Sequence, residues 1–228
     1  MCAITCYFNP IRYTRRQSNY RVFREHLNIP LVTVELSYGS TFELRLSDAD
    51  ILIQLHGHDI LWQKERLLNV ALHAVPRQYD KIAWLDCDFV SANEDWHQAA
   101  SQMLDQKAMV HLFRRWNELR IHALPHNGSN QVEDAKESIV CQYLRGAYEP
   151  QQLRPKVAPQ RVAAWGLGWA ARRELLEEIG FYDACIVGGG DMVMFCAAVA
   201  DYGFAISRLG MNPSQIMAAG SGPRVTAN

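Results

Sequence analysis

The stretch Lys81-Ile82-Ala83-Trp84-Leu85-Asp86-Cys87-Asp88-Phe89-Val90 decides how the chain is interpreted. It is a short apolar run between polar segments, and its β-branched and aromatic content is typical of a buried strand. Residues two apart in a strand point to the same side, so we expect Asp86 and Asp88 to face one ligand while Cys87 faces away. Such oxygen ligands suit Mg²⁺ or Mn²⁺ bound together with substrate phosphates. The alternative is a pair of solvated turn residues that follow a strand.

The composition is that of an ordinary globular protein. Of the 228 residues, 49% are hydrophobic and 21% are charged, which is enough for one substantial core. A formal net charge of −1 argues against a general role in binding nucleic acid. The sequence contains no apolar run of transmembrane length and no basic-then-apolar leader, so we expect a cytoplasmic protein. The six cysteines include no Cys-x-x-Cys pair, which predicts free buried thiols rather than a zinc site or disulfides.

Strands and helices are expected to alternate along the first half of the chain. Strands are predicted at residues 3–7, 31–36, 50–55, 81–90 and 109–113. Helices are predicted from the capping box Thr14-Arg15-Arg16-Gln17, from Asp59 to Val75, and from the capping box Ser91-Ala92-Asn93-Glu94 with Trp96, Ala99 and Met103 facing inward. This alternation predicts an α/β fold with a mostly parallel sheet and helices on both faces.

Basic residues in two of these helices are candidates for binding an anion. Lys64 falls on the apolar face of the second helix, whereas Arg66 falls on the opposite face. A buried lysine needs a partner, and we weigh equally an anionic ligand at the carboxyl edge of the sheet and a side chain that snorkels to solvent. Arg15 and Arg16 lie in the first turn of the first helix, where a positive potential would suit a diphosphate unless both are simply solvated.

The second half of the chain is less regular. Residues 114–159 form a long polar stretch, with a short helix expected around 134–144. Order returns at 162–170, followed by a helix at 173–179 that Gly180 ends. Gly188-Gly189-Gly190-Asp191 then opens a helix to about Tyr202, and its glycines would let the backbone approach a ligand closely. Asp191 is a helix cap, a catalytic group or both. The tail at 211–228 is expected to be weakly ordered.

Three motifs together resemble a known family of enzymes. They are Trp62-Gln63-Lys64-Glu65-Arg66-Leu67-Leu68-Asn69, Trp84-Leu85-Asp86-Cys87-Asp88, and Trp165-Gly166 with Gly188-Gly189-Gly190-Asp191. Over residues 3–203 the chain resembles GT-A-fold glycosyltransferases of the galactosyltransferase and chondroitin-synthase type. The resemblance implies a Rossmann-like domain at 1–210, with a nucleotide-binding half at 1–113, a catalytic half at 160–203 and a long acceptor-side loop. It also implies a UDP-sugar donor, a saccharide or other hydroxyl acceptor, and Mn²⁺ or Mg²⁺ as cofactor.

The same resemblance implies roles for individual residues. Asp191 matches the catalytic base, while Asp86 and Asp88 match an Asp-x-Asp motif in which the second acid binds the metal and the first helps to position the ribose or the metal. Donor-binding residues expected from matching positions are Phe8, Asn9, Pro10, Arg12, Lys64, Asp86, Trp165, Gly166, Gly189 and Gly190. One base without an evident nucleophile implies direct displacement with inversion at the anomeric carbon.

The chain departs from this family at two places. Related enzymes usually carry an acid where Gly190 stands, and they commonly have a metal-binding histidine near the C-terminus, whereas here no histidine follows His126. These departures motivate one alternative, a nucleotide-sugar-binding remnant with impaired catalysis. Another alternative is a sugar nucleotidyltransferase, but such enzymes usually open with a glycine-rich basic loop, which Phe8-Asn9-Pro10-Ile11 lacks.

Overall fold

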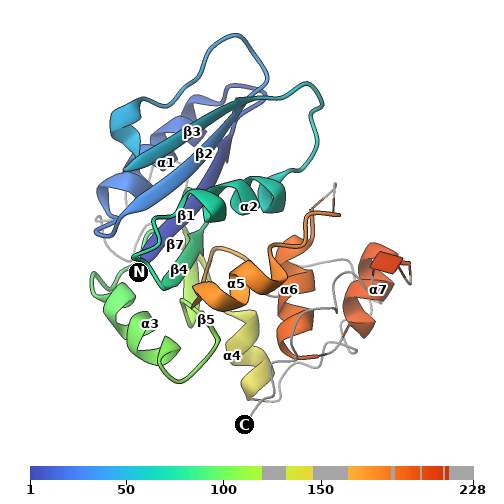
Figure 1. Cartoon of the computed structure of the whole chain (residues 1–228). Coiled ribbons are helices and arrows are strands. Elements are labelled where there is room, and N and C mark those ends of the chain that lie inside the picture. The colour runs from blue at the N-terminus through green and yellow to red at the C-terminus, as the bar shows by residue number, and fades with distance from the viewer. Residues whose placement is uncertain (120–131, 146–163, 186–187, 201, 213, 216–228) are drawn as a thin grey trace.

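The computed structural model describes residues 1–119, 132–145, 164–185, 188–200, 202–212 and 214–215 (Figure 1). The strands are β1 (Cys2–Phe8), β2 (Leu31–Ser37), β3 (Ile51–His56), β4 (Lys81–Leu85), β5 (Met109–His111), β6 (Arg115–Leu119), β7 (Val132–Glu137) and β8 (Gly168–Arg172). The helices are α1 (Thr14–Glu25), the short 3₁₀ helix η1 (Leu46–Asp48), α2 (Lys64–Ala74), α3 (Trp96–Leu104), α4 (Ile139–Leu144), α5 (Arg173–Ile179), α6 (Gly190–Ala198) and α7 (Gly203–Leu209). Among the described helices, none is long and apolar enough to cross a membrane.

Six strands form the central sheet, in the order β3-β2-β1-β4-β8-β5. The first four are parallel, and β8 runs antiparallel to both of its neighbours, β4 and β5. The predicted mostly parallel α/β sheet is therefore confirmed. Because parallel strands end at the same edge, the chain segments that follow β1, β2 and β4 meet there.

Each face of the sheet carries its own hydrophobic core. Strand alternation directs Ile4, Val34 and Trp84 toward a core shared with α2, α5 and α6, whereas Tyr7 and Leu85 point to a core shared with α1 and α3. The predicted helices on both faces are thus confirmed. Figure 1 shows α4, α5, α6 and α7 gathered at the end of the molecule away from β2 and β3. All six cysteines lie in the described residues and are free thiols; four are buried as predicted, whereas Cys141 and Cys185 are only partly buried.

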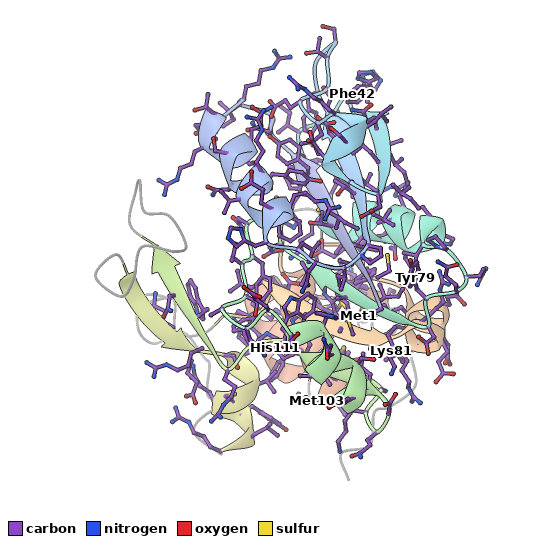
Figure 2. All side chains as sticks on the ribbon, turned by 90° about the vertical axis from the view of Figure 1, so that its left-hand side faces the viewer. Met1, Phe42, Tyr79, Lys81, Met103 and His111 are labelled. Carbon is purple, nitrogen blue, oxygen red and sulfur yellow. The ribbon has the colours of Figure 1, made fainter. Side chains whose placement is uncertain are left out.

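The predicted helix starts are wrong in detail. Helix α3 begins at Trp96 with Asp95 as its N-cap, because Ser91 Oγ instead accepts a hydrogen bond from the Asn93 N–H at 3.2 Å in a local turn. Its buried face is Trp96, Ala100 and Leu104, and Met103, labelled on this helix in Figure 2, is 53% exposed. Ala100 and Leu104, rather than the predicted Ala99 and Met103, therefore face the sheet together with Trp96.

The other two early helices also differ from prediction at their first residues. Thr14 lies inside α1 rather than capping it, since Tyr13 is the N-cap and its backbone N–H donates to Asn9 Oδ1 at 2.9 Å. Helix α2 begins at Lys64 with Gln63 as its N-cap, five residues after the predicted cap Asp59. The hydrogen bond at the start of α1 reaches only four residues back, to Asn9, so local contacts other than the predicted capping box are made there.

The second half contains more structure than the sequence predicted. Within the polar stretch, β6 and β7 pair antiparallel, and Figure 2 shows them standing out from the main sheet. The helix expected at 134–144 is only α4, because β7 continues to Glu137 and Ser138 caps the helix by accepting from the Cys141 N–H at 3.2 Å. The rest of the predicted loop, at 120–131 and 146–159, lies outside the described residues.

The helix predicted from Asp191 to Tyr202 ends earlier than expected, and a second helix follows it. Helix α6 ends at Ala198, Ala200 has a positive φ of 55°, and Gly203 begins α7 rather than ending α6. Met211, which was assigned to the tail, is buried in the core on the α6 side. Residues 216–228 of the predicted tail lie outside the described residues.

Candidate active site

The two acids of the Asp-x-Asp motif follow strand β4 rather than lying in it. The strand ends at Leu85, and a turn is closed by a hydrogen bond from the Phe89 N–H to the Asp86 carbonyl at 3.0 Å. The alternation argument that placed both acids toward one ligand therefore does not apply. Asp86 faces the α2 side of the sheet, whereas Asp88 is exposed and lines a cavity beside α1.

Lys64 joins three segments that are far apart in the sequence. Its ammonium Nζ lies 2.6 Å from Asp86 Oδ1 and 2.8 Å from Asp191 Oδ2. The lysine side chain is 8% exposed, and the two aspartates are 31% and 23% exposed. The sequence left open an anionic ligand or solvent as the partner of this lysine, and the structure places two carboxylates of the protein against it.

Backbone contacts fix Asp86 from the opposite side. The Asp86 N–H donates to the Leu167 carbonyl at 2.8 Å, and the Leu167 N–H donates to Asp86 Oδ2 at 3.1 Å. Leu167 itself has a positive φ of 70°, a conformation that is uncommon for a non-glycine residue. The segment before β8 is thus shaped to hold the carboxylate of Asp86.

The surroundings shift the pKa values of the two aspartates in opposite directions. Burial works against ionisation of Asp86, but the ion pair with Lys64 and the N–H of Leu167 lower its pKa below the usual range. Burial raises the pKa of Asp191, and Lys64 opposes that rise. Although burial alone would lower the pKa of Lys64, its two carboxylate partners raise it, so the lysine stays charged. The arrangement keeps Asp86 ionised and makes Asp191 the more basic carboxylate.

Glycines surround Asp191 for different physical reasons. A Cβ on Gly166 would lie 2.4 Å from Asp191 Oδ2, so a side chain there would collide with the carboxylate. Gly188 and Gly189 have φ of 90° and 104°, which glycine alone adopts readily. Gly189 is the N-cap of α6, so Asp191 lies in the first turn of the helix and is not its cap.

A cavity of about 320 Å³ adjoins Asp88. It is lined by Tyr13, Thr14, Arg15, Arg16, Asn19, Cys87 and Asp88. Arg16 lies 5.2 Å from the centre of the Phe8 ring, and its Nε is buried without a hydrogen-bond partner among the described residues. Two arginines at the start of a twelve-residue helix give this cavity a positive wall suited to an anion.

The predicted base-binding residues line a smaller cavity of about 100 Å³, at the ends of β1 and β2. Asn9, Pro10 and Arg12 contribute to its wall. The Asn9 amide Nδ2 donates to Glu43 Oε2 at 2.9 Å and to the Tyr13 carbonyl at 3.1 Å, so this side chain anchors the surrounding loops. Phe8 instead packs edge-on against Trp62, with ring centres 5.5 Å apart.

Trp165 is partly buried beside α6. Its ring packs edge-on against Phe195 at 5.3 Å, and its carbonyl accepts a hydrogen bond from Trp169 Nε1 at 2.8 Å. The tryptophan therefore supports the segment that carries Gly166 and Leu167.

Sequence reasoning missed two ionisable groups near this cluster. Glu65 is 3% exposed, and burial raises its pKa to about 7. His111, at the end of β5, packs between Phe113 and Trp169, and burial lowers its pKa to about 4. The sequence did contain a hint for Glu65, because this residue directly follows the inward-facing Lys64. The position of His111 depends on the pairing of β5 with β8, which the sequence does not reveal.

The residues present fit a divalent metal only if a substrate supplies further ligands. Both oxygens of Asp86 are engaged by Lys64 and Leu167, while Asp88 forms no ion pair with any described residue. In the part of the chain that the structure describes, no group of three His, Cys, Asp or Glu side chains could hold a metal ion. Mg²⁺ and similar ions are often bound by one or two carboxylates together with substrate phosphates, and Asp88 beside the arginine-lined cavity is compatible with that mode.

Comparisons with known proteins give distant likenesses. No protein-family model matches the chain, and no curated protein sequence matches it. Among solved structures it is similar to a TarS fragment from S. aureus, with 12% identity, a TM-score of 0.42, and 84% of this chain and 52% of that chain covered. It is also similar to the mannosyltransferase PcManGT from Pyrobaculum calidifontis in complex with GDP-Man and Mn²⁺, with 14% identity, a TM-score of 0.46, and coverage of 87% and 52%.

A third likeness is to the bifunctional IspDF from Campylobacter jejuni, with 10% identity, a TM-score of 0.43, and coverage of 86% and 47%. The chain spans about half the length of each of these three structures. Because the likenesses are distant, the assignments that follow rest on the residues of the chain itself.

Proposed function

We propose that the chain is a metal-dependent glycosyltransferase that moves a hexose from a UDP-sugar to a hydroxyl acceptor with inversion. The observation that carries this proposal is the ammonium of Lys64 between Asp86 and Asp191. It unites the three sequence motifs that resemble nucleotide-sugar transferases at the carboxyl edge of a parallel sheet, where such folds bind ligands.

Asp191 is the general base in this proposal. Its carboxylate accepts the proton of the acceptor hydroxyl, whose oxygen forms the new bond to the anomeric carbon. The bond from that carbon to the diphosphate oxygen breaks, and its electron pair leaves with the nucleoside diphosphate. Burial raises the pKa of Asp191, which makes it a stronger base than a solvated aspartate. Lys64 limits that rise, so that the ionised form remains available.

The donor diphosphate would lie in the cavity beside α1. Arg15 and Arg16 supply positive charge there, and Asp88 stands at the other wall. A divalent metal would be held by Asp88, with Asp86 nearby, and when bound it would neutralise charge on the departing diphosphate. The buried Nε of Arg16, which has no partner among the described residues, is one donor that such an anion would satisfy.

The remaining donor-binding assignments follow from the same placement. Asn9, Pro10 and Arg12 would border the nucleoside, and Phe8 would support that wall through Trp62. The transferred sugar would lie near Gly166, Gly189 and Gly190, with Trp165 behind them. The close approach of Gly166 to Asp191 supports this wall, because a larger residue there would displace the base.

One observation favours the alternative of a nucleotide-sugar-binding protein without turnover. Lys64 and the Leu167 N–H engage both oxygens of Asp86, so this acid is a poor metal ligand unless the lysine moves. The two functions differ in whether the bound donor is consumed.

The test combines donor binding with transfer. UDP and GDP are titrated calorimetrically into the purified chain with Mn²⁺ and with chelator, and UDP-glucose, UDP-galactose and GDP-mannose are assayed for nucleotide release with a panel of saccharides. We expect Mn²⁺-dependent UDP binding in the parent chain and in Asp191→Asn, with transfer in the parent alone. Asp183→Asn, an exposed aspartate, serves as the matched control. Binding without transfer in the parent chain would favour the binding protein, and absence of nucleotide binding would contradict both functions.

A further inference from the structure

Glu65 occupies the space that a side chain on Gly190 would fill. It is the second residue of α2 and is 3% exposed. A Cβ built on Gly190 would lie 2.1 Å from Glu65 Oε1 and 2.3 Å from its Cδ, which is far inside van der Waals contact. The carboxyl group of Glu65 in α2 therefore lies directly against Gly190, the first residue of α6.

Backbone conformation does not explain the glycine at this position. Positive φ values occur at Gly188 and Gly189, but Gly190 is helical and is not among the glycines with positive φ. A larger residue would suit the first turn of α6 equally well if the carboxyl of Glu65 were absent. What requires glycine at 190 is the room taken by Glu65.

The carboxyl of Glu65 is held next to the base, and its own backbone N–H donates a hydrogen bond to it. Among the described residues it forms no ion pair, and no other residue donates a hydrogen bond to it. The nearby ammonium of Lys64 is already shared by Asp86 and Asp191. A carboxylate can accept about four hydrogen bonds, so most of its acceptor sites remain available to donors that arrive from outside. Burial raises the pKa of Glu65 to about 7, and the hydrogen bond from its own backbone opposes that rise.

We propose that Glu65 accepts a hydrogen bond from a second hydroxyl of the acceptor, adjacent to the hydroxyl that Asp191 deprotonates. Glu65 lies against Gly190, the residue next to Asp191 in α6, so two carboxyl groups from different helices border one place. A carboxylate offers only acceptors, and neighbouring hydroxyls of a saccharide offer two donors. The inference rests on the proposed transferase function and deepens it, because it selects a saccharide with vicinal hydroxyls over an isolated alcohol.

The test removes the acid at position 65 of α2 and introduces an acid at position 190 of α6. Glu65→Ala should reduce transfer at least about 100-fold, because the acceptor would lose the hydrogen bond between one of its hydroxyls and a buried group of the protein. Affinity for UDP should change less than about twofold, because no donor-binding residue is altered. Gly190→Asp alone should lose transfer through collision with Glu65, whereas Glu65→Ala combined with Gly190→Asp should recover at least about tenfold over Glu65→Ala.

Controls separate this inference from the proposed function. Glu174→Ala, an exposed glutamate in the first turn of α5, should leave transfer unchanged. Glu65→Met keeps the approximate length of the side chain and removes its acceptor oxygens if Glu65→Ala fails to fold. The acceptor that the parent uses best is compared with analogues lacking one hydroxyl, and loss of the neighbouring hydroxyl should cost the parent more than it costs Glu65→Ala.

If the parent transfers sugar and Glu65→Ala or Glu65→Met transfers equally well, the role of Glu65 is refuted and the transferase stands. If the double variant recovers nothing over Glu65→Ala, the exchange of the acid between helices is refuted. If the parent binds no nucleotide and transfers nothing, the proposed function itself fails, and the role of Glu65 fails with it.

Discussion

Replacing Lys64 with methionine would remove one ammonium and keep a side chain of similar length. Two partly buried carboxylates, those of Asp86 and Asp191, would then lack their common partner. Removing one partner of a buried ion pair typically costs about 3–5 kcal/mol, because the remaining charge stays out of water. The partial exposure of the two aspartates places the expected loss of unfolding free energy near the lower end, at about 3 kcal/mol.

The loss should depend on pH with a definite sign. Without the lysine, the folded pKa values of Asp86 and Asp191 rise above their unfolded values. A carboxyl group with a raised folded pKa contributes stability that is present below its unfolded pKa and is lost as pH rises through the folded one. The destabilisation of Lys64→Met relative to the parent should therefore be larger at pH 8 than at pH 4.5.

The assay is urea unfolding followed by circular dichroism at both pH values. The matched control is Arg77→Met, which removes a cation that lies 2.6 Å from Glu177; the Arg77 side chain is 84% exposed. Such an exposed pair is worth about 0–1 kcal/mol. If Lys64→Met destabilises the protein no more than Arg77→Met does, the buried ion cluster does not exist as described.

Three further predictions concern single residues of the site. Asp88→Ala should weaken UDP binding about tenfold with Mn²⁺ and leave it unchanged in chelator, as measured by calorimetry; equal affinity with the metal would exclude Asp88 as a ligand. Gly166→Ala should lower transfer about 100-fold with unchanged UDP affinity, because its methyl would meet the base at 2.4 Å, whereas Gly168→Ala, at 3.2 Å from Leu85, should have a much smaller effect. Glu65→Gln should remove a decline in unfolding free energy of about 3 kcal/mol between pH 4.5 and 8, since the pKa of Glu65 is raised to about 7 in the folded protein; a parent chain without this decline would refute the raised pKa.

Much of the fold could be predicted because its strongest signals are local. The buried strands β1, β2 and β4 and the partly buried edge strand β3 are short apolar runs. The apolar stripe of α2 predicted the inward direction of Lys64. The errors fall where local and tertiary preferences compete. Ser91 closes a turn instead of capping α3, and β6 and β7 arise within a stretch without an apolar pattern.

The sequence by itself determined an α/β sheet, the inward lysine, and the acids worth testing, because periodicity and turn residues encode them within short windows. Only the tertiary structure decided how these groups combine. It turned Asp86 toward Lys64 and Asp88 toward the arginine-lined cavity, since the strand ends one residue before the motif. It also brought Asp191 to the same ammonium across 127 positions of the sequence, and no local pattern carries information about a contact of that separation.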